Sequence, residues 1–251
     1  MEELRKVGSG ASMEEDIDAD EHLPPLEVGP QEHRLQYTYG LWYIGKTNYQ
    51  QYDLTLKKIG RFASVEQFWA LYSHLVRPSD LHSPSDFFLF KDGIKPMWEH
   101  KGNREGGQWL VRLNKGLAAR CWENLVMAIL GEQFNVGDEI CGAGVSMRQK
   151  KDCISLWNKT SADQETTEKI RDVMRKVLNL PSNFQLEYRC HKDVLQWLNN
   201  RDVGVGGPSV GPSKPRSTSP IMESLPLRGF SGGTGGGAPG LHLPNSSNAH
   251  R

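Results

Sequence analysis

All seven tryptophans of this 251-residue chain lie between Trp42 and Trp197, and this distribution limits where the chain can form a core. A buried core needs large apolar side chains, and Trp is the largest of them. The length allows one sizeable domain with tails or two small domains. Because one segment holds every Trp, we predict a single domain that spans residues 33–198.

The two flanking segments have the composition of tails. Residues 1–32 contain ten Asp or Glu, only two Lys or Arg, and no aromatic side chain, so they cannot offset the entropy of ordering. In residues 199–251, Gly, Pro and Ser account for 26 of 53 positions, as in flexible linkers. We predict a disordered acidic N-terminal tail and a disordered Gly/Pro/Ser-rich C-terminal tail.

Between the tails, strand-like segments alternate with three helical patterns. The first helix begins at Ser64, with Gln67 completing a capping box; the second covers 117–134, and the third opens at Ser161 and stops before Pro181. The expected strands are HRLQYTYGLWYI, LTLKKIGRF, FFLF, QWLVRL, EICGAGVSMR, DCISLWN and FQLEYRC. Strand pairs joined by hairpins predict an α+β fold, in which an antiparallel sheet is covered by helices on one face.

Charge and cysteine content indicate the class of ligand and the cellular compartment. Residues 33–198 carry 23 basic and 18 acidic side chains, which suits an anionic ligand or nucleic acid, although ordinary solvated charge explains it as well. The four Cys show no metal-ligand spacing, and the first residues lack an apolar signal segment, so we expect free thiols in the cytoplasm. No run of 18 apolar residues predicts a membrane span, and neither a metal nor a cofactor is expected.

The sequence lacks the motifs that common enzymes carry. GxxxxGK[ST], GxGxxG after a strand, GxSxG and HExxH are all missing, and the eight His are scattered. We therefore expect a protein that is not an enzyme and has no catalytic residues.

One loop, KDGIKPMWEHKG, places Trp98 directly before Glu99. Aromatic faces are platforms for unstacked bases, and a carboxylate accepts hydrogen bonds from an edge rich in N–H donors, which among the common bases means guanine. The pair is consistent with guanine recognition. The alternative is that Trp98 simply fills the core beneath the loop.

Four separated motifs carry a resemblance to a known family. DGIKPMWE at 92–99, SVEQFWALY at 64–72, GGQWLVRLNK at 106–115 and LGEQF at 130–134 resemble the messenger-RNA cap-binding translation initiation factor 4E family. The resemblance extends from about His33 to His191. It implies a curved antiparallel sheet with three helices on its convex face and the cap on its concave face.

The same resemblance implies the roles of individual residues. The 7-methylguanine ring is expected between Trp98 and Tyr52, the latter in the loop at Asn48–Tyr52, with Glu99 accepting from N1–H and the 2-amino group. The Trp98 backbone N–H would meet O6, and Trp157 would lie near the methyl group. Methylation at N7 makes guanine cationic, which adds cation–π attraction to stacking.

For the triphosphate, the resemblance implies Arg148 and Lys150, whereas from the sequence alone these two and Lys151 only solvate a hairpin turn. Three positions depart from the usual pattern: Tyr52 replaces Trp, Gln108 replaces Arg and Cys153 replaces Lys. With the segment KGLAARCWEN, these changes predict weaker cap binding and a likeness to the divergent 4E-homologous class, whose members repress translation.

A second surface is implied on the convex face, where the family receives partner peptides of the form Tyr-x4-Leu-hydrophobic. The matching residues are Val65, Trp69, Met127, Leu130 and Gly131. By spacing alone, Trp69 would be a core residue. Arg34, Glu123 and Asn124 differ from the family's usual Pro, Leu and Glu, which disfavours binding of the large initiation scaffold.

These observations together predict a cap-binding repressor of translation. The protein would be a monomer on its own, would occupy the cap without recruiting the scaffold, and would be tethered to transcripts by repressor-type partners. One alternative is an initiation factor that does recruit the scaffold and the ribosome. Another is a cap-processing hydrolase or methyltransferase.

Overall fold

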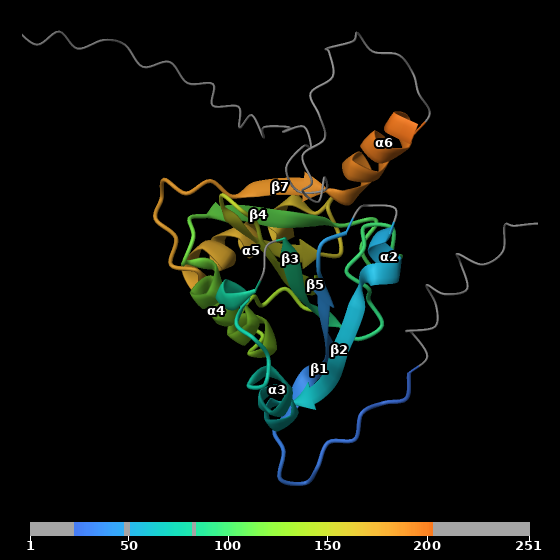
Figure 1. Ribbon diagram of the computed structural model, residues 1–251, viewed down its shortest axis with the longest axis vertical. Coiled ribbons are helices and arrows are strands. Elements are labelled where there is room, and N and C mark those ends of the chain that lie inside the picture. Colours follow the sequence, from blue (N-terminus) through green and yellow to red (C-terminus); the bar gives the residue numbers. More distant parts are fainter. Residues whose placement is uncertain (1–22, 48–50, 82–83, 203–251) are drawn as a thin grey trace, which may run out of the picture.

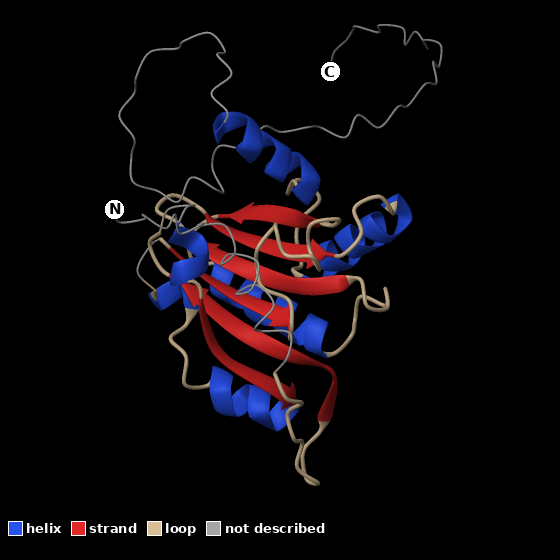
Figure 2. Cartoon of the chain, turned by 90° about the vertical axis from the view of Figure 1, so that its right-hand side faces the viewer, coloured by secondary structure: helices blue, strands red, loops and turns tan. Residues whose placement is uncertain are grey.

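The computed structural model describes residues 23–47, 51–81 and 84–202, and these build an open seven-stranded sheet (Figure 1). The strand order is β2-β1-β3-β5-β6-β4-β7, and every neighbouring pair is antiparallel. The strands are β1 Arg34–Ile44, β2 Lys57–Ser64, β3 Ser85–Lys91, β4 Gly107–Leu113, β5 Ile140–Met147, β6 Asp152–Asn158 and β7 Glu187–Cys190. The predicted α+β fold with a curved antiparallel sheet is confirmed (Figure 2).

Five helices and one 3-10 turn accompany the sheet in the described part of the chain. They are α2 Tyr52–Thr55, α3 Val65–Tyr72, η3 Pro78–Asp80, α4 Ala118–Leu130, α5 Gln164–Val177 and α6 His191–Asp202. Apolar side chains of α3, α4 and α5 join one face of the sheet in the main hydrophobic core. These three helices therefore cover the convex face, as predicted.

The two faces of the sheet differ because successive side chains of a strand point to opposite sides. Alternate residues of the strands enter the core beneath the helices, among them Leu41, Leu89, Val111, Val145 and Leu156. Their neighbours in sequence face the concave side instead. The concave face is thus free to carry a site.

Local capping signals explain where two helices begin. Ser64 Oγ accepts from the Gln67 backbone N–H at 3.1 Å, and Gln67 Oε1 accepts from the Ala63 N–H at 3.0 Å, one residue earlier than in a standard capping box. The expected start of the third helix at Ser161 is wrong. Asp163 caps α5 by accepting from the Thr166 N–H at 3.0 Å.

Two helices were not anticipated. α2 occupies the beginning of the segment predicted as the second strand, which starts only at Lys57. α6 packs Val194, Leu195 and Leu198 on the concave side and continues to Asp202, past the predicted domain end at 198. The apolar residues of α6 recur at helical spacing, but their partners lie in other parts of the chain.

The residues that precede β1 run along the domain. Arg61 donates to the Pro24 carbonyl at 3.1 Å, and Gln67 Nε2 donates to the Glu27 carbonyl at 2.9 Å and to the Glu32 carboxylate at 2.8 Å. The remainder of the predicted tails, residues 1–22 and 203–251, lies outside the described residues. Within the described ranges, no helix has the length and apolar character needed to cross a membrane.

Candidate functional site

An aromatic cluster covers the concave face of the sheet. Its buried aromatic members are Trp42, Phe88, Phe90, Trp98 and Trp157. The Phe90 and Trp157 rings meet edge to face, with centroids 5.2 Å apart. Strand β5 supplies glycines beneath these rings: a Cβ at Gly142 would lie 2.5 Å from the Phe90 ring, and one at Gly144 would lie 2.7 Å from Phe88. The aromatic floor of the concave face therefore depends on small residues in the neighbouring strand.

A pocket opens above this floor and gathers residues from distant parts of the sequence. It is lined by Thr47, Tyr52, Asp86, Phe88, Pro96, Met97, Trp98, Glu99, Gln108, Ser146, Arg148, Ser155 and Trp157. Five of the six predicted ligand residues are among them. The sixth, Lys150, is exposed in the turn between β5 and β6 and does not line the pocket.

Trp98 is 6% exposed, so the indole both packs in the aromatic cluster and lines the pocket. Its loop is fixed by Asn103, whose Nδ2 donates to the carbonyls of Lys95 at 2.7 Å and Met97 at 2.8 Å. The Asn103 carbonyl in turn accepts from Nδ1 of His191 at 2.7 Å, at the first residue of α6. This anchor ties the loop to the first residue of α6.

Neither Asn103 nor His191 was predicted as a site residue. Both side chains are fully buried, and burial lowers the pKa of His191 to about 4, although the bond to the Asn103 carbonyl acts in the opposite direction. The imidazole is therefore neutral at physiological pH, with its proton on Nδ1. Their contact joins residues 88 positions apart, which no local pattern could reveal.

Tyr52 begins α2 and reaches across the pocket toward the Trp98 loop. Its hydroxyl donates to the Pro96 carbonyl at 3.1 Å. Burial raises the pKa of Tyr52 well above its usual range, and the nearby charges of Asp86 and Glu99 raise it further. The phenol is therefore neutral and acts as a donor. Of the loop predicted to present it, residues 48–50 lie outside the described part of the chain.

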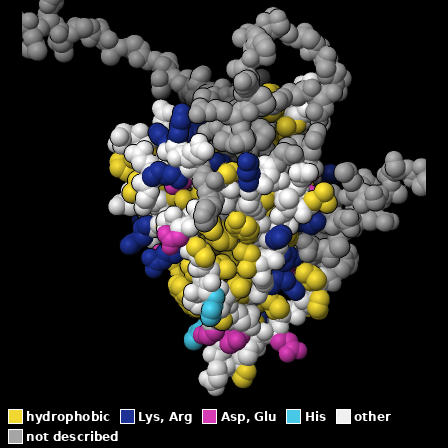
Figure 3. Space-filling view, viewed as in Figure 1, with side chains coloured by type: hydrophobic (Ala, Val, Ile, Leu, Met, Phe, Trp, Pro, Cys, Tyr) yellow, Lys and Arg dark blue, Asp and Glu magenta, His cyan; other side chains and the backbone are white. Residues whose placement is uncertain are grey.

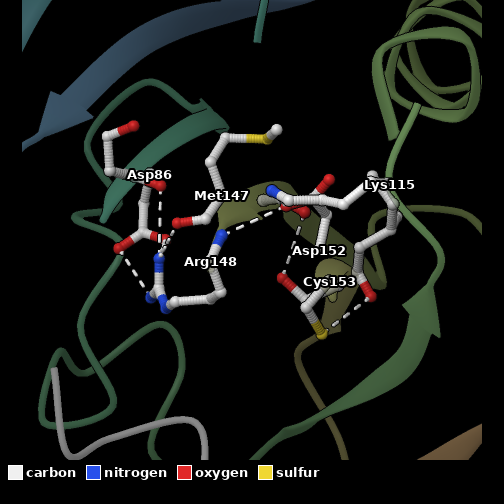
Figure 4. Close-up of polar contacts among 10 residues, drawn as sticks. Asp86, Lys115, Met147, Arg148, Asp152 and Cys153 are labelled. Carbon is white, nitrogen blue, oxygen red and sulfur yellow. Dashed lines mark hydrogen bonds and ion pairs between the residues drawn. The ribbon is translucent and has the colours of Figure 1, made fainter. Parts of the chain in front are cut away.

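Arg148 follows β5, and its guanidinium faces Asp86 (Figure 4). The ion pair measures 2.8 Å, and Nη1 also donates to the carbonyls of Ser85 at 3.2 Å and Met147 at 3.0 Å. The Arg148 backbone N–H donates to Asp152 Oδ1 at 3.1 Å. This is more than a solvated hairpin residue, because Arg148 is only 7% exposed and its charge is compensated inside the pocket.

The convex face presents the second predicted surface. Val65 is 39% and Trp69 48% exposed, so the alternative that Trp69 is a core residue is wrong. Met127 and Leu130 are partly buried in α4, and the exposed Gly131 ends that helix. Figure 3 shows hydrophobic side chains gathered in the centre of this view, between α3 and α4.

A hollow of about 280 Å³ adjoins Trp69 on this face. Its lining mixes aromatic side chains, including Tyr72 and Trp122, with Arg77 and Glu123. Burial raises the pKa of Tyr72 to about 12, and the Glu123 charge contributes to the rise. A partner seated here would therefore meet a carboxylate beside an apolar patch.

A curved antiparallel sheet with an aromatic pocket on its concave face is the architecture of cap-binding translation factors. The structure described as a complex of C. elegans eIF4E-3 with the 4E-binding protein Mextli and cap analog has a TM-score of 0.63 to this chain at 41% identity, covering 66% of this chain and 96% of that one. Ascaris suum eIF4E-3 with m7G cap has a TM-score of 0.62 at 40% identity, over 64% and 92% of the two chains.

Sequence comparison specifies the family. The model of the family described as Eukaryotic initiation factor 4E matches residues 34–203. Eukaryotic translation initiation factor 4E-4 of Caenorhabditis elegans is 47% identical over 173 residues, which cover 67% of this chain and 82% of that protein. Eukaryotic translation initiation factor NCBP of Arabidopsis thaliana is 38% identical over 201 residues, or 78% and 91% of the two chains. The chain belongs to the eukaryotic initiation factor 4E family, a family of cap-binding translation factors rather than enzymes.

Proposed function

We propose that this protein binds the 7-methylguanosine cap of messenger RNA in the concave pocket. The observation that carries the proposal is that one pocket collects Tyr52, Trp98, Glu99 and Trp157 from separate parts of the chain. Family membership and the cap ligands of the similar eIF4E-3 structures support it.

The charges in the pocket favour a methylated base. Tyr52 and Trp98 flank the ring and Glu99 accepts from its N–H edge, while Trp157 lies near the methyl group. A cationic ring gains cation–π attraction from both aromatic faces and is drawn to the negative side chains. A neutral guanine lacks these gains. Each stacked aromatic contributes about 1–3 kcal/mol, so the loss of one ring costs one to two decades of affinity.

Arg148 and Lys150 are proposed to contact the triphosphate. Arg148 lines the pocket and would divide its donors between Asp86 and a phosphate oxygen. Lys150 sits exposed in the adjoining turn, where its long side chain would contribute charge rather than a fixed contact.

A titration with two nucleotides tests cap binding. We expect 7-methylguanosine triphosphate to quench Trp fluorescence of the full chain at concentrations at least about tenfold lower than plain guanosine triphosphate, because only the methylated ring is cationic. Equal affinity for the two nucleotides would remove the basis of the proposal.

We further propose that the protein represses translation, occupying the cap without recruiting the initiation scaffold. Repressor-type partners with a Tyr-x4-Leu-hydrophobic segment would bind the convex surface around Trp69 and tether the protein, a monomer on its own, to chosen transcripts in the cytoplasm. What supports this is the Glu123 carboxylate in the hollow beside Trp69, where the family usually has Leu, which disfavours an initiation scaffold that brings an apolar or acidic side chain to that position.

The alternative within the family is a factor that recruits the scaffold and the ribosome. Titrations with a scaffold peptide and with a repressor peptide separate the two roles. Tight binding of the scaffold peptide, together with stimulation of cap-dependent translation in an extract, would replace the repressor assignment. Release of a 7-methylguanine nucleotide from capped RNA would instead establish a processing enzyme.

A further inference from the structure

A group of basic side chains lies beside the pocket, at the end of the concave face formed by β4, β6 and β7. On β4, Gln108 pairs with Trp157 of β6 and with Arg189 of β7. Gln108 and Trp157 line the pocket, so Arg189 continues the same row of side chains toward the edge strand. Adjacent strands lie about 4.8 Å apart, which places Arg189 next to the pocket wall.

Alternation along the strands puts a second arginine on this face. Trp109, Val111 and Leu113 of β4 enter the core beneath the helices, so Gln108 and Arg112 point to the concave side. On β7, the Tyr188 ring packs at a tilt against Trp109 on the core side, with ring centroids 4.9 Å apart. Glu187 and Arg189 therefore face the concave side with Arg112.

The arginines are incompletely paired. Arg112 Nη1 and Arg189 Nη2 both contact Glu187, the latter at 3.4 Å, a long distance for a charged hydrogen bond. Arg189 is 9% exposed, and its Nη1 is buried without a hydrogen-bond partner. Burying a charged donor without an acceptor costs free energy, and an anionic ligand that accepts a hydrogen bond from this nitrogen would remove that cost.

The net charge of this end of the face is positive. Arg112, Arg189 and Arg148 share the two carboxylates of Glu187 and Asp86, which leaves one positive charge uncompensated. All three guanidinium groups lie close enough to the Cys153 thiol to lower its pKa, although burial prevails and raises that pKa to about 12. The three cations thus surround an uncharged Cys153, with Glu187 and Asp86 as their acidic partners.

We propose that Arg189 and Arg112, bridged by Glu187, bind the phosphate groups of the nucleotide whose base occupies the pocket. The inference rests on the proposed function and specifies how the phosphate end of that ligand is recognised. A guanidinium presents a planar fork of N–H donors that matches a phosphate group, and a phosphate oxygen would supply the acceptor that Arg189 Nη1 lacks. Glu187 competes with the phosphate for the same donors and therefore weakens phosphate binding.

Two charge-removing variants test the contact. Full-length Arg112→Gln and Arg189→Gln are titrated with 7-methylguanosine triphosphate and with 7-methylguanosine, which has no phosphate. Each variant should lose about tenfold or more in affinity for the triphosphate and keep its affinity for the nucleoside. Arg120→Gln, an exposed charge change on α4, is the matched control and should alter neither affinity.

A third variant gives an effect of opposite sign. Glu187→Gln removes the competing carboxylate, so affinity for the triphosphate should rise about threefold or more while the nucleoside affinity stays constant. If these ion pairs only stabilised the fold, removing the Glu187 charge would not raise the affinity for the triphosphate. Arg112 is partly exposed, so its variant remains informative if Arg189→Gln fails to fold.

The outcomes separate this inference from the cap-binding proposal. If the wild-type protein distinguishes methylated from plain guanosine triphosphate but the arginine variants bind the triphosphate normally, the phosphate assignment is wrong and cap binding stands. Equal losses for triphosphate and nucleoside would also overturn it, because the arginines would then support the fold. A wild-type protein that ignores methylation would refute the cap-binding proposal itself.

Discussion

Replacing Asn103 with Ala should destabilise the protein and loosen the loop that carries Trp98. The Asn103 amide donates two hydrogen bonds, at 2.7 Å to the Lys95 carbonyl and at 2.8 Å to the Met97 carbonyl. The Lys95 carbonyl keeps a second donor, the Met97 N–H at 2.8 Å, and so loses only the net value of one bond, about 0.5–1.5 kcal/mol. The Met97 carbonyl loses its side-chain donor, which costs about 1–3 kcal/mol.

The two contributions predict a loss of about 1.5–4.5 kcal/mol in the free energy of unfolding, measured by urea denaturation with Trp fluorescence. Because Trp98 directly follows Met97, affinity for 7-methylguanosine triphosphate should fall about fivefold or more while the convex-face peptide site is unaffected. Asn124→Ala is a suitable control, since that amide makes a single long contact of 3.5 Å to the Val177 carbonyl. If the two variants were equally stable, or if Asn103→Ala kept full affinity for the cap nucleotide, the anchoring role of Asn103 would be refuted.

Four further predictions address the pocket, the buried imidazole and the convex surface. Trp98→Ala should abolish retention on 7-methylguanosine-diphosphate resin, and normal retention would argue against the sandwich. Tyr52→Trp should tighten binding of the same nucleotide, because the larger indole stacks better; unchanged or weaker binding would show that ring size does not limit the pocket. Since His191 has a pKa of about 4 in the folded chain and about 6.5 when unfolded, stability should fall by up to about 3 kcal/mol as pH drops from 6.5 to 4, and His191→Phe should flatten that part of the urea-denaturation profile. Trp69→Ala should cost no more than about 2 kcal/mol of stability, because the ring is half exposed, yet should reduce binding of a Tyr-x4-Leu-hydrophobic peptide at least about tenfold in a titration.

The sequence predicted the strands and the three covering helices because their signals are local. Ser64 and Gln67 are three residues apart, and their capping interaction is formed with a shift of one residue. The alternation of apolar and polar residues likewise follows from the two faces of a strand. Where two local signals competed, as between Ser161 and Asp163, the wrong cap was chosen.

The surroundings of single side chains could not be predicted in this way. Trp69 has the helical spacing of a core residue, and only the packing of α3 at the sheet edge leaves it half exposed. Arg148 was identifiable as a basic residue near a turn, but its partner Asp86 lies 62 positions earlier. The contact spans β3 and β5, which the sheet order makes neighbours.

The amino-acid sequence by itself thus determined the class of fold and, through resemblance, the family and the Trp98–Glu99 loop. Only the tertiary structure decided that Asn103 and His191 anchor this loop, that Arg148 is paired, and that Arg189 is not fully paired. The physical reason is distance along the chain: periodicity and capping act within a few residues, whereas burial, ion pairing and pKa shifts arise from segments that meet only after the sheet has formed.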